Sequence, residues 1–123
     1  MKILYDSLTG NVGRFVKKLP LKTEKITTEL TVNEPFILIT YTTGLGHVPV
    51  VTETFLNKNN EFLRAVASSG NKNFGAYFAL ASDVISKKYD VPIVANFELS
   101  GTPTDVKNFM KGLDAFETHR IKQ

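Results

Sequence analysis

The run "PFILITY", residues 35–41, most constrains the fold, because it is an unbroken series of apolar and β-branched side chains. A strand with one face in solvent alternates apolar and polar residues, whereas a continuous run is typical of a strand covered on both faces. Strands of that kind lie inside parallel sheets that carry helices on both sides. We therefore expect residues 35–41 to form a central strand of an α/β domain.

The rest of the chain alternates strand-like runs with segments of helical periodicity. Strands are predicted at residues 2–6, 24–30, 35–41, 62–68 and 91–99, and helices at about 12–18, 51–60, 74–89 and 101–116. The second strand is polar enough to lie at an edge. Because right-handed crossovers limit the topology, the pattern predicts a doubly wound, mostly parallel sheet in a single domain spanning residues 1–123.

Two of the predicted helices have a defined apolar face. The segment 74–89 carries Tyr77, Phe78, Ala81, Val84 and Ile85 at helical spacing, and the last helix carries Val106, Phe109, Met110, Leu113 and Phe116. Thr102 is a candidate N-cap of the last helix, with Pro103 at its first position and Asp105 in its first turn.

Composition excludes several classes of protein. The chain has 123 residues, 42% hydrophobic and 22% charged, as in soluble globular domains, and no run reaches the roughly 20 apolar residues of a membrane span. The absence of cysteine excludes disulfides and thiolate metal sites, and with no secretory signal expected it favours a cytoplasmic location. The net charge of +3 comes from scattered lysines, which argues against nucleic-acid binding.

Ligands of doubly wound folds lie beyond the carboxyl ends of the strands, so the loops after the first, third and fourth strands hold the candidate site. The first loop, "SLTGN", contains Ser7, Thr9 and Asn11 as side-chain donors, and Gly10 allows close approach of the backbone to an anion. The spacing fits neither a Walker A loop nor G-x-G-x-x-G. The loop is therefore either a phosphate site or an ordinary turn capped by asparagine.

The second loop, "TYTTGLGHVP" at residues 40–49, places Thr42 and Thr43 at the end of the buried strand, followed by Gly44 and Gly46. Glycines permit close approach of a flat ligand, although the loop could also be a plain flexible connection.

The third loop, "ASSGNKNFG" at residues 67–75, offers Ser69, Gly70, Asn71 and Asn73 as small or amide-bearing groups. Phe74 either stacks on an aromatic ligand or is the first core residue of the next helix. One anion-binding loop with two loops suited to a flat heteroaromatic predicts a mononucleotide site, and flavin mononucleotide (FMN) is the natural candidate.

These three loops resemble the phosphate loop and the two isoalloxazine loops of flavodoxin-like proteins. Together with "GRF", "KYDVPIV" and "NFELSGT", the combination looks most like the NrdI family, the small flavodoxin-like activators of class Ib ribonucleotide reductase. The resemblance covers nearly the whole chain and implies a five-stranded sheet of order 2-1-3-4-5. Ordinary flavodoxins are longer and have an acidic surface, whereas this chain is short and basic, which favours the resemblance to the NrdI family.

The resemblance also implies roles for particular residues. The phosphate would be held by Ser7, Thr9, Gly10, Asn11 and Val12. The ribityl chain and the N5 edge of the ring would be lined by Thr42, Thr43 and Gly44. The pyrimidine side and one ring face would be held by Ser69, Gly70, Asn71, Asn73 and Phe74.

As for activity, the resemblance implies that the reduced flavin converts O₂ to superoxide, which passes to the dimanganese site of the reductase small subunit and generates its tyrosyl radical cofactor. An unidentified flavin reductase would supply the electrons. The flavin carries the chemistry, so no catalytic acid–base pair is required and none is visible. The rivals are a one-electron flavodoxin serving another reductase and a non-redox module that binds a phosphate or nucleotide.

Four further residues have competing interpretations. Asp6 follows the first strand, where a receiver domain keeps its phosphoacceptor, but no further carboxylates accompany it to hold Mg²⁺. Arg14 either reaches the phosphate or, as we favour, lies on the solvated face of the first helix. His47 either tunes the flavin or is an ordinary loop histidine, and His119 is expected in a frayed tail. We predict no metal site.

Overall fold

The computed structural model describes residues 1–44 and 46–122, in which five strands form one parallel sheet of order β2-β1-β3-β4-β5. The strands are β1 (Lys2–Tyr5), β2 (Thr23–Lys25), β3 (Phe36–Tyr41), β4 (Leu63–Gly70) and β5 (Phe97–Glu98). The α-helices are α1 (Asn11–Lys17), α2 (Val50–Asn59), α3 (Leu80–Tyr89) and α4 (Pro103–Lys122), and two 3₁₀ helices are η1 (Asn60–Phe62) and η2 (Lys72–Tyr77). The predicted fold class and strand order are confirmed.

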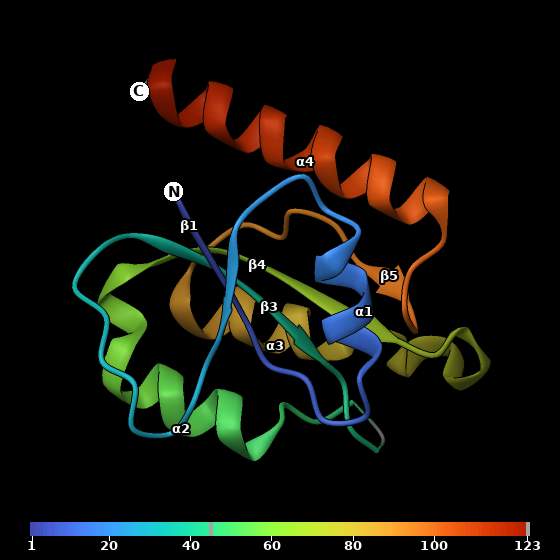
Figure 1. Cartoon of the computed structure of the whole chain (residues 1–123). Helices are drawn as coiled ribbons and strands as arrows, with labels where there is room; N and C mark the ends of the chain where they lie inside the picture. The colour runs from blue at the N-terminus through green and yellow to red at the C-terminus, as the bar shows by residue number, and fades with distance from the viewer. Residues whose placement is uncertain (45, 123) are drawn as a thin grey trace.

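Helices cover both faces of the sheet, α1 and α4 on one side and α2 and α3 on the other (Figure 1). The central strand β3 is buried on both, as its unbroken apolar run predicts. Ile37 and Ile39 pack with α1 and α4, whereas Phe36 and Leu38 pack with α2 and α3. The strand period of two thus divides one apolar run between two cores.

The predicted start of α4 is confirmed in detail. The Asp105 backbone N–H donates to Thr102 Oγ1 at 3.0 Å, and the Thr102 N–H donates to Asp105 Oδ2 at 3.0 Å. This reciprocal pair satisfies donors at the helix start, as in a capping box. Phe109 and Leu113 are buried on the inner face, with the half-buried Val106, Met110 and Phe116 packed beside them.

The second strand is shorter than predicted and begins earlier. The expected range 24–30 was wrong at both ends, since β2 pairs with β1 only over Thr23–Lys25. Beyond that point the Leu30 N–H donates to Thr27 Oγ1 at 3.1 Å. A side chain that bonds to its local backbone favours a turn over a strand, which ends β2.

The fifth strand is also shorter than the predicted range 91–99. Ile93 forms an isolated bridge with Val66, and regular pairing resumes only at Phe97–Glu98. Between them the Ser68 N–H donates to the side chain of Asn96, Oδ1, at 3.1 Å. The amide side chain replaces a backbone carbonyl of the ladder, so the strand is interrupted there.

The single helix predicted for residues 74–89 is wrong, because two breaks divide that segment. Gly75 has φ 54° and ψ −117° inside η2, and Ala79 is left-handed with φ 51° just before α3. Tyr77 and Val84, expected on the buried face, are exposed. The periodicity of apolar residues was real, but the backbone is α-helical only from Leu80, after the 3₁₀ helix η2.

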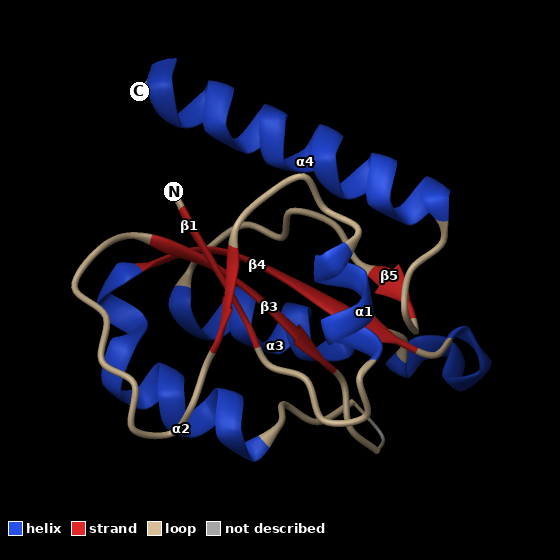
Figure 2. Ribbon diagram, in the orientation of Figure 1, coloured by secondary structure: helices blue, strands red, loops and turns tan. Residues whose placement is uncertain are grey.

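The loops after β1, β3 and β4 gather at the end of the sheet toward which the strand arrows point (Figure 2). None of the helices in the described part of the chain has the length and apolarity needed to cross a bilayer. His119, expected in a frayed tail, lies in α4.

Candidate functional site

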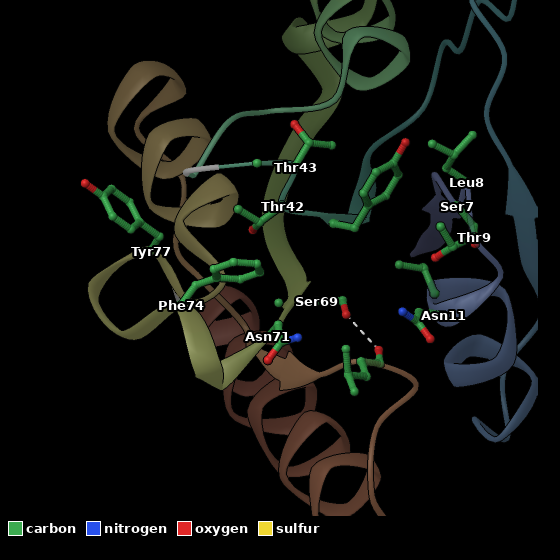
Figure 3. A pocket seen from close by; sticks show the side chains of 15 residues that line it. Ser7, Leu8, Thr9, Asn11, Thr42, Thr43, Ser69, Asn71, Phe74 and Tyr77 are labelled. Atoms are coloured by element: carbon green, nitrogen blue, oxygen red, sulfur yellow. Dashed lines mark hydrogen bonds between the residues drawn. The ribbon is translucent and has the colours of Figure 1, made fainter.

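A cavity of about 320 Å³ opens where β1, β3 and β4 end (Figure 3). Its position is the one that parallel α/β folds use for ligands. The walls are formed by Ser7, Leu8, Thr9, Asn11, Val12, Tyr41, Thr42, Thr43, Gly44, Ser69, Gly70, Asn71, Phe74, Tyr77 and Leu99.

The first wall is the turn between β1 and α1. The Gly13 N–H donates to Ser7 Oγ at 3.1 Å, which bends the chain into α1 and leaves the Ser7 hydroxyl hydrogen able to donate. Gly10 is the N-cap of α1 with φ 94°, a left-handed conformation that favours glycine. The alternative of an asparagine cap is therefore wrong, since Asn11 is the first residue of the helix.

Asn11 joins this wall to the loop between β5 and α4. Its Oδ1 accepts hydrogen bonds from Arg14 Nη2 at 2.7 Å and from Ser100 Oγ at 2.8 Å. Arg14 Nε also donates to Ser100 Oγ, at 2.9 Å, and Lys18 Nζ donates to Ser100 O and Gly101 O. Arg14 is exposed, as predicted, but its guanidinium is bonded to two partners.

The end of β3 forms the floor of the cavity. The Thr42 N–H donates to Ser69 O at 3.0 Å, and Thr42 Oγ1 accepts the Ala81 N–H at 3.2 Å, so this side chain ties β3 to the start of α3. Thr43 and His47 exchange two backbone hydrogen bonds, at 2.8 and 2.9 Å, across a tight turn. Gly44 has φ 50°, which that turn requires.

The remaining wall follows β4, which runs through Gly70 instead of ending at residue 68 as predicted. A Cβ at Gly70 would collide with the Ala79 backbone, so glycine lets the segment between η2 and α3 pack against the strand. The Asn73 N–H donates to Asn71 Oδ1 at 2.9 Å. Phe74 is 52% exposed and lines the cavity, so its interpretation as a core residue is wrong.

Most predicted site residues are brought together, but two are not among the lining residues. Gly10 shapes the first wall through its left-handed backbone, and the Asn73 N–H donates to the side chain of Asn71. Sequence reasoning did not select four lining residues, which are Leu8, Tyr41, Tyr77 and Leu99. Leu8 was visible as the only large apolar residue of a polar turn, and it is 76% exposed at the cavity.

A buried carboxyl group lies between the end of β1 and α2, directly before the first wall in the chain. Asp6 is only 3% exposed, and Thr52 Oγ1 donates to its Oδ2 at 2.7 Å while sharing a second 2.7 Å bond with Thr40. Burial raises the pKa of Asp6, opposed by the Thr52 hydrogen bond and the charge of Lys25. Burial and the nearby Asp6 charge raise the pKa of Tyr41.

This surrounding does not fit a receiver-type phosphoacceptor. Among the described residues, no group of three or more His, Asp and Glu side chains could hold a metal ion. Asp6 instead makes a structural hydrogen-bonded network under the site.

The fold has clear counterparts among solved structures. A flavodoxin from Streptococcus pneumonia TIGR4 superposes with a TM-score of 0.70 at 20% identity, covering 96% of this chain and 97% of that chain. Oxidised Flavodoxin 2 from Bacillus cereus superposes with a TM-score of 0.68 at 18% identity, covering 97% and 99%. The fold and the cavity at its strand ends define the class, a flavodoxin-like protein.

Sequence comparison identifies the family within that class. The model of the family described as "NrdI Flavodoxin like" matches residues 3–111. Protein NrdI from Bacillus licheniformis is 50% identical over 119 residues, which cover 96% of this chain and 91% of that protein. The chain belongs to the NrdI flavodoxin-like family, and the resemblance stated from the sequence is confirmed.

Proposed function

We propose that this protein binds FMN in the cavity and activates the small subunit of a class Ib ribonucleotide reductase. The observation that carries the proposal is a cavity with hydroxyl and amide donors on one wall and exposed aromatic rings on another, in a member of the NrdI flavodoxin-like family. Such a mixture suits a ligand with an anionic end and a flat aromatic end.

The residues present fit FMN. A volume of about 320 Å³ lies at the lower end of the range for small-molecule sites, and the cavity is open on one side, so part of a ring could remain exposed. Phe74 provides a ring directed toward the other lining residues, and Tyr77 lies farther out with its hydroxyl directed away from them (Figure 3). Gly44 and Gly70 line the floor and the β4 wall with backbone atoms alone.

Each wall would have its own task. The phosphate would accept hydrogen bonds from the segment 7–12, where Ser7, Thr9, Gly10, Asn11 and Val12 supply hydroxyl, amide and backbone donors. The floor residues Thr42, Thr43 and Gly44 would contact the ribityl chain and the N5 edge of the ring. The pyrimidine side and one ring face would meet Ser69, Gly70, Asn71, Asn73 and Phe74.

When bound, FMN would supply the conversion of O₂ to superoxide that assembly of the dimanganese-tyrosyl radical cofactor needs. The protein would bind and orient the flavin and leave one edge open to O₂ and to the small subunit. A separate flavin reductase would provide electrons, in the cytoplasm. The site requires neither nucleic acid nor a membrane for this task.

The test is a titration of the purified protein with FMN, followed by anaerobic reduction and exposure to O₂. We expect stoichiometric binding, rapid reoxidation with release of superoxide, and capture of the small subunit on immobilised protein. Slow reoxidation without superoxide would favour the rival function, a general electron-transferring flavodoxin. Absence of flavin binding would overturn the proposal and favour a module that binds another phosphate compound.

A further inference from the structure

We propose that Arg14 is a positioning residue for the ligand phosphate, acting through the side chain of Asn11. This inference rests on the proposed function, since it specifies how the first wall of the cavity is aligned. Arg14 itself is not among the residues that line the cavity. Its effect on the ligand therefore has to pass through a residue that does.

The hydrogen bonds form a closed ring of three side chains. Arg14 Nε donates to Ser100 Oγ, Ser100 Oγ donates to Asn11 Oδ1, and Arg14 Nη2 donates to the same Oδ1, at distances of 2.9, 2.8 and 2.7 Å. A guanidinium group can only donate. The oxygen of Asn11 must therefore face Arg14, because the opposite orientation would place amide hydrogens against guanidinium hydrogens.

The consequence appears at the cavity. Because Oδ1 of Asn11 faces Arg14 and Ser100, the amide nitrogen of Asn11 lies on the cavity side (Figure 3). An amide nitrogen offers two N–H donors and no acceptor, which suits a phosphate oxygen and not a cation. Without Arg14 the amide could turn its oxygen toward the phosphate and repel it.

The backbone beneath the guanidinium is shaped to admit it. A Cβ at Gly10 would lie 2.7 Å from Arg14 Nη1, closer than side chains pack, so a larger residue at position 10 would displace the guanidinium. Two hydrogen bonds of this ring of side chains also join residues that are distant in the sequence, by 86 and by 89 positions. The ring therefore links α1 and the β5–α4 loop, on one side of the cavity.

Lys18 provides a matched control. It is also a basic side chain at the end of α1, and it bonds to the same loop through Ser100 O and Gly101 O, at 3.1 and 2.8 Å, but it does not contact Asn11. Loss of either residue removes one positive charge and one anchor of the loop. Only loss of Arg14 releases the Asn11 amide.

The experiment measures the Kd of FMN and of riboflavin, which lacks the phosphate, for the wild-type protein and for variants. We expect Arg14→Ala to weaken FMN binding about tenfold and riboflavin binding less than twofold, because a charge-assisted hydrogen bond is lost and only the phosphate end senses it. Lys18→Ala should change both less than twofold. In an Asn11→Ala background, Arg14→Ala should add less than a twofold effect.

Four results would overturn the inference. Equal losses in Arg14→Ala and Lys18→Ala would assign the effect to charge or loop anchoring. A tenfold loss that persists in the Asn11→Ala background would mean that Arg14 does not act through Asn11. Wild-type affinity for FMN in Arg14→Ala would end the inference while leaving flavin binding intact, whereas a wild-type protein that binds no FMN would end both. Should Arg14→Ala unfold, Arg14→Met keeps the length of the side chain but cannot donate to Asn11, and it should weaken FMN alone about tenfold.

Discussion

The two walls of the cavity are built in opposite ways. The wall formed by residues 7–12 is linked through Asn11, Arg14 and Ser100 to a loop far along the chain. Its Val12 belongs to the same buried core cluster as Phe15. The second wall is formed by η2, Lys72–Tyr77, and consists of exposed residues. It makes few hydrogen bonds; one of them joins the Lys72 N–H to Glu98 Oε2 at 3.0 Å.

This difference matches the two ends of the proposed ligand. Recognition of a phosphate depends on donors held at fixed positions, because hydrogen-bond energies fall steeply with misalignment. Contact with a flat ring depends on area and tolerates movement of the side chain. We therefore expect the first wall to be coupled to the stability of the protein and the second wall to be nearly independent of it.

The largest expected effect is that of Phe15→Ala. The ring is fully buried, stacks on Phe97 with centroids 3.7 Å apart and meets Phe109 edge to face at 5.6 Å. Its loss should lower the free energy of unfolding by about 3–5 kcal/mol through lost contacts and a cavity. Urea denaturation of the ligand-free protein measures it, and a loss below about 1 kcal/mol would show that the first wall does not depend on this core.

An intermediate effect concerns pH and the buried Asp6, which directly precedes the same wall in the chain. Because burial raises its pKa in the folded state, the folded protein holds this proton more tightly than the unfolded chain. The resulting contribution to stability is full below the unfolded pKa of about 4 and is lost as pH rises through the folded pKa.

Asp6→Asn carries no such proton, so its stability relative to wild type should improve as pH rises from 3 to 7. Urea midpoints across this range measure the difference, with the exposed Asp114→Asn as a control for removal of a carboxyl group. Parallel curves for wild type and Asp6→Asn would show that the carboxyl group titrates alike in both states.

The smallest effect on stability is expected for Phe74→Ala, the same substitution placed on the second wall. Because the ring is 52% exposed, the free energy of unfolding should change by no more than about 0.5 kcal/mol. Binding of FMN and of riboflavin should weaken alike, each about fivefold, since a lost ring contact of about 1 kcal/mol does not involve the phosphate. Unchanged affinity for both flavins would remove Phe74 from the site.

Much of the architecture was predictable because local chemistry encodes it. The unbroken apolar run at 36–41 indicated a doubly covered strand, and Thr102 with Asp105 indicated where α4 begins. The polar, glycine-containing ends of three strands indicated the cavity, because parallel strands bring their carboxyl ends to one edge.

Other features depended on partners that are distant in the sequence. Helical periodicity extended across residues 74–89, but Ala79 packs closely on Gly70 in a left-handed conformation and so divides the segment. The side chain of Asn96 interrupts the last strand by bonding to Ser68. Neither the hydrogen bond between Asn96 and Ser68 nor the break at Ala79 is indicated by a local sequence pattern.

The sequence by itself thus determined the order of the elements, the class of fold, the family and the three loops of the site. Only the tertiary structure decided which side chains face the cavity and what holds them, as Tyr41, Leu99 and the link from Arg14 to Ser100 illustrate. The physical reason is the separation in sequence over which each interaction acts. Hydrophobic period and capping act within a few residues, whereas a contact across 86 residues exists only once the crossovers have packed the sheet.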